Sequence, residues 1–483
     1  MDSTALCTLR DCTFAYSGEG AALRNVTLHV RAGELVMLVG PSGCGKTTAT
    51  RLVNGLAPRH FTGTLTGHAC TGGLEASRAP LESYARVVGS VFQNPKTQYF
   101  HARSTDELAF PCENAGMPAP QIRERVRQVA ARFGIADLLD RAIVNLSGGQ
   151  QQRLAVASAA VLEPAVMVLD EPTSNLDTAS MARLHGMIAA LKADGVAIVI
   201  AEHRLAWCAD LVDRYCVFDG GELLGAYTAR EFEALPATQR EAWGLRALDV
   251  SADRARIAEL ARAAHGEGAP VFGTRGLEVG YRKRALFRRG VEFSLRIPDV
   301  DVYGGQIVGI MGRNGAGKST FARTLCGLQA PLAGMVELGG EPASSSALSR
   351  AAALVMQDVH YQLFAESVRA EVMLETVQAG GELAAAREQC DALLGELDLL
   401  DVADRHPMSL SGGQKQRLAI AVALMGKKRF VVLDEPTSGL DRAHMMQVGA
   451  LLRELADRGV AVLVITHDDE LAAHWCDRIL ALD

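Results

Sequence analysis

The stretch Leu146-Ser147-Gly148-Gly149-Gln150 is followed, 22 residues after its first position, by Val168-Leu169-Asp170-Glu171-Pro172. The same two stretches return, at the same spacing, as Leu410-Ser411-Gly412-Gly413-Gln414 and Val432-Leu433-Asp434-Glu435-Pro436. A serine before two glycines is a typical helix start, and an apolar run that ends in carboxylates is typical of a buried parallel strand. The chain therefore carries the same helix-and-strand unit twice.

The repetition extends over most of the chain. Gln93, Ser147, Asp170 and His203 each lie 264 residues before their counterparts, which are Gln357, Ser411, Asp434 and His467. Near the start the spacing changes, because the second copy has a basic run at residues 282–289. We predict two domains, residues 1–235 and 271–483, joined by a linker, residues 236–270, that ends in a run rich in glycine and proline.

A glycine-rich loop with the spacing G-x-x-x-x-G-K-[ST] follows a short apolar strand in each copy. Backbone N–H groups of such a loop point at phosphates, the lysine supplies positive charge, and the Thr or Ser hydroxyl is offered to magnesium. Residues 11–16 before the first loop read as an edge strand that ends in Tyr16. We predict ATP-binding residues in both loops: Gly40, Ser42, Gly43, Gly45, Lys46, Thr47 and Thr48, and Gly312, Asn314, Gly315, Gly317, Lys318, Ser319 and Thr320.

The phosphate loop, the Leu-Ser-Gly-Gly-Gln stretch, the Asp-Glu pair and a later histidine, in this order and twice, resemble the ATPases of the ATP-binding-cassette (ABC) family. The resemblance covers nearly all of both predicted domains. It implies an α/β fold with two P-loop NTPase domains in tandem. Each would have a RecA-like parallel-sheet core, an antiparallel β subdomain and a helical subdomain that carries the signature. It also implies an ATPase that uses ATP and Mg²⁺.

The resemblance assigns roles to matching residues. Glu171 and Glu435 would orient and deprotonate the attacking water, and His203 and His467 would contact the γ-phosphate. The magnesium set would be Thr47, Gln93, Asp170, Ser319, Gln357 and Asp434. Tyr16 and Tyr281 would stack on adenine, although a tyrosine packed on its strand is the alternative, more so for Tyr281 beside the basic run.

In this family the signature serine of one copy closes on nucleotide held by the other. The resemblance thus implies that Ser147 and Gly149 bind the ATP at Lys318, and that Ser411 and Gly413 bind the ATP at Lys46. Since both copies lie in one chain, we expect the two ATPase domains to pair within it.

One part of the first copy narrows the subfamily. Residues 93–98, 106–110 and 113–114 resemble the ATPases of energy-coupling factor (ECF) importers, which take up vitamins and transition-metal ions in prokaryotes; the second copy lacks the Pro and Glu-Asn. This implies integral membrane transport subunits as partners, a common coupling subunit and a substrate-binding subunit, at the cytoplasmic face of the cell membrane. Acidic residues that could receive a basic coupling helix, or be plain surface charges, are Asp106, Glu107, Glu366 and Glu371.

Bulk properties are in line with this interpretation. The net charge of −7 and the aromatic content of 5% argue against a nucleic-acid partner. No apolar run approaches the roughly 20 residues that span a bilayer. The ten cysteines contain no Cys-x-x-Cys pair, so we expect neither a zinc site nor disulfides, and a reduced cytoplasmic setting.

Other tandem ABC proteins stay open as alternatives. A translation-factor type usually has Asn-His-Leu-Asp where this chain has Ser-Asn-Leu-Asp and Ser-Gly-Leu-Asp. A sugar-importer ATPase commonly has a degenerate second copy, and a DNA-repair ATPase has far more than the 101 residues between Lys46 and Ser147. The basic run 282–289 reads as a solvated hairpin, with lipid headgroups or nucleic acid as the alternative contact.

Overall fold

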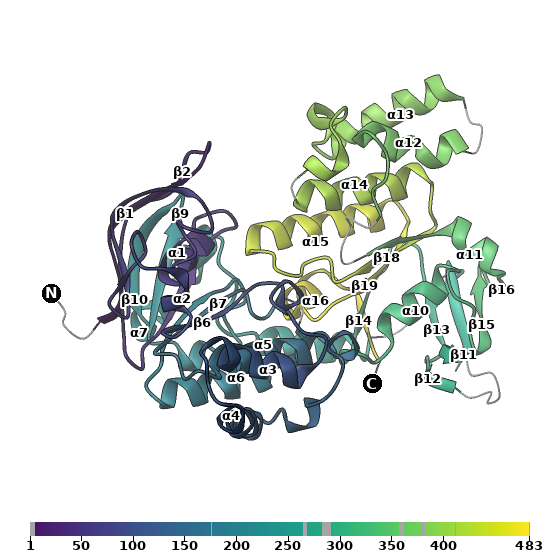
Figure 1. Ribbon diagram of the computed structural model, residues 1–483. Coiled ribbons are helices and arrows are strands. Elements are labelled where there is room, and N and C mark those ends of the chain that lie inside the picture. Colours follow the sequence, from purple (N-terminus) through teal and green to yellow (C-terminus); the bar gives the residue numbers. More distant parts are fainter. Residues whose placement is uncertain are drawn as a thin grey trace. The chain divides into compact units, whose positions relative to one another are not determined.

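The computed structural model describes residues 5–174, 176–263, 268–282, 291–356, 362–378, 382–410 and 412–482 (Figure 1). The fold divides into two compact units. The first comprises Met1–Asp249 with Gly439–Ala443, and the second comprises Val250–Ser438 with His444–Asp483. The boundary after Asp249 lies inside the segment 236–270 that we predict as a linker. Of the basic run, residues 283–289 lie outside the described residues.

The first unit contains a six-stranded core sheet and a four-stranded antiparallel sheet. The core sheet has the order β10-β9-β3-β8-β7-β6 and is parallel except for the β9–β10 pair. Its strands are β3 (Leu35–Val39), β6 (Val88–Val91), β7 (Val166–Asp170), β8 (Ala197–Ala201), β9 (Arg214–Asp219) and β10 (Glu222–Thr228). The second sheet has the order β2-β1-β4-β5, with β1 (Ala5–Tyr16), β2 (Ala21–Arg31), β4 (Gly63–Thr71) and β5 (Leu74–Glu75).

The prediction of an edge strand over residues 11–16 is wrong. β1 is an inner strand, paired antiparallel with β2 on one side and β4 on the other. Both ladders shift register around Asp11, whose φ is 49°. A bulge of this kind interrupts the period-two alternation of buried side chains. The sequence therefore shows only the second half of the strand.

The core sheet is buried on both faces. Along β3, Leu35, Met37 and Val39 belong to one apolar cluster, and the intervening Val36 and Leu38 belong to a second. Successive side chains of a strand point to opposite faces, so a continuous apolar run is what a strand covered on both sides requires.

Helices cover this sheet. α1 contacts strands of both sheets, while α3, α4 and α5 pack against one another and α6 lies against α5 (Figure 1). The helices of the unit are α1 (Lys46–Val53), α2 (Leu81–Tyr84), α3 (Ser104–Asn114), α4 (Ala119–Arg132), α5 (Gly148–Ala160), α6 (Thr178–Ala193), α7 (Ala229–Glu233) and α8 (Ala237–Ala242).

The second unit repeats this plan. Its core sheet is parallel throughout, in the order β17-β18-β19-β14-β20, with β14 (Ile307–Met311), β17 (Ala352–Val355), β18 (Phe430–Asp434), β19 (Ala461–Ile465) and β20 (Arg478–Ala481). An antiparallel sheet contains β11 (Phe272–Arg282), β12 (Val291–Arg296), β13 (Val300–Val302), β15 (Ala333–Leu338) and β16 (Glu341–Pro342). The prediction of two α/β domains in tandem is thereby confirmed.

The helices of the second unit also match those of the first. α12, α13 and α14 pack against one another, and α9 contacts α16. The bounds are α9 (Ser251–Leu260), α10 (Lys318–Leu325), α11 (Ser345–Ala351), α12 (Val368–Gln378), α13 (Leu383–Glu396), α14 (Gly412–Met425), α15 (Arg442–Asp457) and α16 (Asp469–Trp475). Among the described residues, no helix combines the length and apolar character needed to cross a membrane.

Candidate functional site

A glycine loop joins an inner strand of each core sheet to the following helix. In the first unit it runs from the end of β3 to α1, and in the second from β14 to α10. Gly40 and Gly312 have φ values of 147° and 158°, and a Cβ at either would overlap a backbone carbonyl, that of Phe218 or Leu482. Each loop therefore needs glycine at its first position in order to turn beneath the neighbouring chain.

The lysine of each loop is buried against its own loop. The Lys46 Nζ donates to the carbonyl oxygens of Gly40 at 2.8 Å and Pro41 at 2.9 Å. The Lys318 Nζ donates to those of Gly312 at 2.7 Å and Arg313 at 3.0 Å. Each ammonium group thus lies beside the backbone that leads into the helix N-terminus, where anions are stabilised.

A hydroxyl and a carboxylate meet at the next position. The Thr47 Oγ1 donates to the Asp170 Oδ1 at 3.1 Å, and the Ser319 Oγ donates to the Asp434 Oδ2 at 2.7 Å. Burial, followed by the charge of Glu171, raises the pKa of Asp170 to about 6, and burial also raises the pKa of Asp434. The predicted hydroxyl and carboxylate ligands thus adjoin in both units.

These residues fit a magnesium ion. Hydroxyl and carboxylate oxygens are the ligands that Mg²⁺ prefers, and the raised pKa values mean that a cation there would stabilise the charged carboxylates. Among the described residues, no cluster of three or more His, Cys, Asp or Glu could hold a metal by itself. Besides these residues and the predicted Gln93 and Gln357, such an ion would take ligands from nucleotide and water.

The predicted glutamine, glutamate and histidine of the first unit lie together. The Gln93 Nε2 donates to the Glu171 Oε2 at 2.7 Å, and the His203 Nε2 lies 3.4 Å from the Glu171 Oε1. Glu171 follows β7 and His203 follows β8, so neighbouring parallel strands bring the pair together at their carboxyl ends.

The second unit reproduces the glutamate–histidine contact. The His467 Nε2 lies 3.4 Å from the Glu435 Oε1, 2.9 Å from the Asn314 Oδ1 and 3.0 Å from the Lys318 Nζ. Asn314 thus touches the predicted γ-phosphate histidine. Gln357 lies outside the described residues.

Both predicted adenine-stacking tyrosines contact the first turn of the loop helix. The Tyr16 hydroxyl lies 3.1 Å from the Thr48 Oγ1, and the Tyr281 hydroxyl lies 3.2 Å from the Thr320 Oγ1. Sequence reasoning missed Arg51, which donates to the Tyr16 hydroxyl at 2.8 Å with its guanidinium carbon 5.8 Å from the ring centre. The signal was available, because an arginine stands five residues after the loop lysine in both copies. The adenine role of both tyrosines stays a prediction.

The signature serine starts a helix, as we predict. Ser147 caps α5: the Gln150 N–H donates to the Ser147 Oγ at 3.4 Å, and the Ser147 N–H donates to the Gln150 Oε1 at 2.9 Å. A Cβ at Gly149 would overlap the Ser180 Oγ, so α5 can approach α6 only with glycine there. Gly413 lies in the first turn of α14, and Ser411 lies outside the described residues.

Two of the four acidic residues that could receive a partner helix are unavailable. Glu107 is 3% exposed and Glu371 is 4% exposed. The Glu107 Oε2 accepts the backbone N–H groups of Phe100 and His101. The Glu371 Oε2 accepts those of Phe364 and Ala365. The prediction is therefore wrong for Glu107 and Glu371, which hold the preceding loop in place, whereas Asp106 and Glu366 are exposed.

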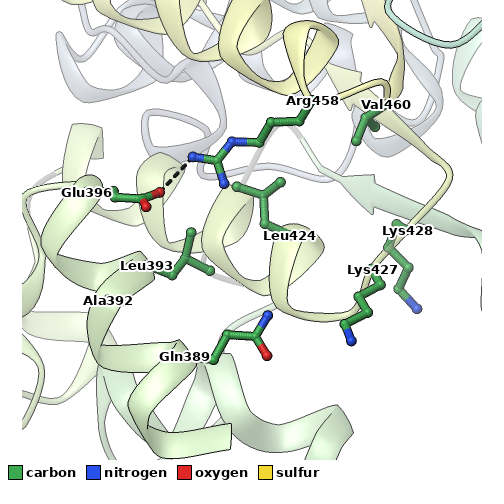
Figure 2. Close-up of a pocket in the computed structure, with 9 residues that line it drawn as sticks. All are labelled: Gln389, Ala392, Leu393, Glu396, Leu424, Lys427, Lys428, Arg458 and Val460. Carbon is green, nitrogen blue, oxygen red and sulfur yellow. Dashed lines mark hydrogen bonds and ion pairs between the residues drawn. The ribbon is translucent and has the colours of Figure 1, made fainter.

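A pocket of about 410 Å³ opens in the second unit between α13, the end of α14 and the turn before β19 (Figure 2). Leu393 and Leu424 line it, and the ion pair of Arg458 with Glu396 borders it. None of the predicted nucleotide-site residues is part of its lining.

Comparison with known proteins agrees with this geometry. The model of the ABC transporter family matches residues 23–174 and 295–438, one match in each copy. A protein of Treponema denticola, provisionally named an ABC transporter ATP-binding protein, is 39% identical over 98% of this chain and 95% of its own length. A Bacillus subtilis protein, provisionally named the HMP/thiamine import ATP-binding protein YkoD, is 30% identical over 99% of this chain and 90% of its own length.

A solved structure matches both units. The archaeal ribosome recycling factor aABCE1, in its complex with the ribosomal stalk protein aP1, aligns with a TM-score of 0.63 over 99% of this chain and 87% of that chain. At 22% identity this shows the fold alone. With a family match in each copy and full-length relatives, the chain belongs to the ABC transporter family as a fused tandem ATPase, and by the rule of that family it binds ATP with Mg²⁺ and hydrolyses it.

Proposed function

We propose that this chain is the ATPase subunit of an energy-coupling factor importer, which drives uptake of a vitamin or a metal ion through membrane partners. The observation that carries the proposal is the ECF-like pattern of residues 93–98, 106–110 and 113–114. The import function printed in the name of the Bacillus subtilis relative supports it. In this proposal the chain lies at the cytoplasmic face of the membrane.

We assign ATP hydrolysis to residues that lie together at the carboxyl ends of the core-sheet strands in each unit. Glu171 and Glu435 orient and deprotonate the attacking water, and His203 and His467 contact the γ-phosphate. Lys46 and Lys318 neutralise phosphate charge. Bound Mg²⁺ neutralises phosphate charge as well. Phosphoryl transfer depends mainly on such positioning and charge neutralisation, so a cluster of fixed donors and one carboxylate is the machinery that it needs.

The pairing of the two copies is a further part of the proposal. It rests on the family pattern: Ser411 and Gly413 would close on the ATP at Lys46, and Ser147 and Gly149 would close on the ATP at Lys318.

An exposed aromatic at matching positions supports a membrane partner. Phe100 is 76% exposed and Phe364 is 79% exposed, and they lie 264 residues apart. Each stands in a loop whose backbone is fixed by a buried glutamate, Glu107 or Glu371. An exposed phenylalanine on a fixed loop is typical of a contact site, since burying such a ring contributes about 1.5–3 kcal/mol.

Co-purification tests the proposal. The tagged chain is isolated from its native host in mild detergent, as wild type and as the Phe100→Asp and Phe364→Asp variants. We expect small polytopic membrane proteins with the wild type, one common and several interchangeable, and at least tenfold less of them with either variant. Leu224→Asp is the matched control, because Leu224 is an exposed apolar residue on β10 and belongs to neither loop.

The same experiment separates the alternatives. Ribosomes or DNA in place of membrane proteins would overturn the transport proposal and leave the ATPase intact. Membrane proteins that include a sugar-binding component would favour a sugar importer.

A further inference from the structure

The two predicted γ-phosphate histidines stand in different triplets. The first copy has Glu202-His203-Arg204, and the second has Thr466-His467-Asp468 at the equivalent positions. A carboxylate therefore precedes the histidine in one copy and follows it in the other. Glu202 is 3% exposed and Asp468 is 2% exposed, so neither is a surface charge.

In the first unit the Glu202 carboxylate joins two loops. Its Oε2 accepts the hydroxyl of Thr173 at 2.7 Å. Its Oε1 accepts the backbone N–H groups of His203 at 2.8 Å and Arg204 at 3.2 Å. Thr173 lies two residues after Glu171, in the loop that follows β7, and His203 lies in the loop that follows β8. One buried carboxylate thus fixes the glutamate loop to the histidine loop.

In the second unit Asp468 makes the same connection from the other side of the histidine. The Asp468 Oδ2 accepts the hydroxyl of Thr437, the counterpart of Thr173, at 2.8 Å. Its Oδ1 accepts the Leu471 N–H at 3.3 Å, and its own N–H donates to the Thr466 Oγ1 at 3.0 Å. The position that Glu202 occupies in the first copy is therefore filled here by a threonine that supports the aspartate.

The outcome at the predicted site is the same in both units. The histidine Nε2 lies 3.4 Å from the glutamate Oε1 in each. We propose that Glu202 and Asp468 are equivalent positioning residues, each of which ties the catalytic-glutamate loop to the histidine loop through the threonine two residues after that glutamate. This inference rests on the proposed roles of Glu171 and His203.

Burying the Glu202 carboxylate costs free energy, which favours a positioning role for it. A buried carboxylate is costly unless several donors satisfy it, and burial raises the pKa of Glu202. A neutral residue would close the same space at lower cost. What the carboxylate adds is a bond to donors on two separate loops, which limits how far Glu171 and His203 can move apart.

The test exchanges the triplets in the full chain. The Glu435→Gln background leaves only the site that contains Glu171 to hydrolyse ATP. In that background we expect Glu202→Thr to lower kcat by about tenfold to a hundredfold, since misplacement by about 1 Å can cost that much, with KM for ATP little changed. The double change Glu202→Thr with Arg204→Asp recreates the second copy's triplet. It is expected to restore kcat to within about threefold, because a carboxylate again reaches Thr173.

Glu171→Gln in the same background distinguishes the proposed role of Glu171 from the positioning role of Glu202. If it leaves kcat unchanged, the proposed role of Glu171 fails and the inference fails with it. If it lowers kcat while Glu202→Thr does not, the inference alone is overturned. A folded double variant that stays as slow as Glu202→Thr would also overturn it.

The reciprocal exchange covers the case in which Glu202→Thr does not fold. Thr466→Glu with Asp468→Arg, in the Glu171→Gln background, places the first copy's triplet in the second unit. Thermal unfolding checks that each variant is folded. Turnover of this reciprocal exchange within about threefold of the Glu171→Gln background supports the inference, and a folded reciprocal exchange that is slower than that contradicts it.

Discussion

Glu171 and Glu435 both adopt a left-handed backbone, with φ values of 43° and 53°. Residues with a Cβ rarely do so, and the conformation costs about 1–2 kcal/mol. The cost persists because the backbone N–H groups of both glutamates bond to the neighbouring strand, to Ala201 and Ile465 at 2.8 and 2.9 Å. Strain of this kind gathers at functional sites, where the surrounding structure fixes a side chain in place.

This backbone strain predicts that a variant with glycine at position 171 is more stable than one with alanine. Glu171→Gly relieves the backbone strain, whereas Glu171→Ala keeps it, and neither has a carboxylate. After allowing for the greater freedom of glycine in the unfolded chain, we expect the glycine variant to exceed the alanine variant in unfolding free energy by about 0.5–1 kcal/mol. Urea unfolding compares them, and an alanine variant of equal or higher stability would contradict the strain.

Cys44 gives a second prediction for a single residue. Nine of the ten cysteines are buried and Cys70 is partly exposed. Burial raises the pKa of the Cys44 thiol, although nearby Lys46 partly offsets this. Because the thiolate is the nucleophile, a raised pKa leaves Cys44 protonated at neutral pH, and its reactivity rises by about tenfold per pH unit toward its pKa.

We therefore expect iodoacetamide at pH 7 to modify Cys70 first and Cys44 slowly. Modification of Cys44 should block nucleotide at its loop, and ATP should protect it. Peptide mass mapping over time measures this. Equal rates for the two thiols, or no protection by ATP, would contradict this prediction.

At the scale of elements, the two units use ion pairs of opposite polarity at one helix junction. In the first, Arg132 at the end of α4 pairs with Asp194 after α6. In the second, Glu396 at the end of α13 pairs with Arg458 after α15 at 2.6 Å (Figure 2). The junction thus accommodates an ion pair of either polarity.

If either polarity is accepted, a second substitution at this pair should restore part of the stability that the first one loses. Glu396→Arg alone places two cations together and should cost about 0.5–1 kcal/mol, since both side chains of the pair are well exposed. Adding Arg458→Asp recreates the first unit's polarity and should recover only part of that loss, because it also removes the ion pair of Arg458 with Glu454. A double-mutant cycle in urea measures the coupling, and a coupling energy of zero would show that the pair contributes nothing.

The sequence predicts an element well when the element's own residues show that it is buried, and poorly when other parts of the chain bury it. The apolar runs of β3 and β7 predict core strands, because a strand buried on both faces has a continuous run of apolar residues that can be recognised without knowing its neighbours. The first half of β1 was not predicted because the bulge at Asp11 interrupts the alternation of buried and exposed residues along the strand. The prediction that Glu107 and Glu371 are available on the surface is wrong because backbone N–H groups six or seven residues earlier bind their carboxylates. No local sequence pattern shows this contact.

For the candidate site, motif spacing predicts which residues adjoin but not what holds them. Thr47 with Asp170, and Glu171 with His203, meet as expected. The buried carboxylates beside the histidines are invisible without the fold, since they approach the same threonine from different sequence positions.

At the scale of the whole molecule, both copies carry a complete set of the hydrolytic residues that the sequence predicts. The units differ in loop lengths and in the triplets around their histidines, yet they bring the glutamate and the histidine to the same separation. A tandem ATPase with one degenerate copy would not be expected to keep this geometry twice. We therefore predict that both halves of this one chain hydrolyse ATP.

Steady-state ATP turnover of the purified full chain tests that claim most directly. Glu171→Gln and Glu435→Gln should each lower kcat, and the two together should lower it by at least about 100-fold, the usual contribution of a general base. ATP binding should persist in all three variants. If one single change leaves kcat at the wild-type value while the other abolishes turnover, only one half hydrolyses ATP and the claim is contradicted.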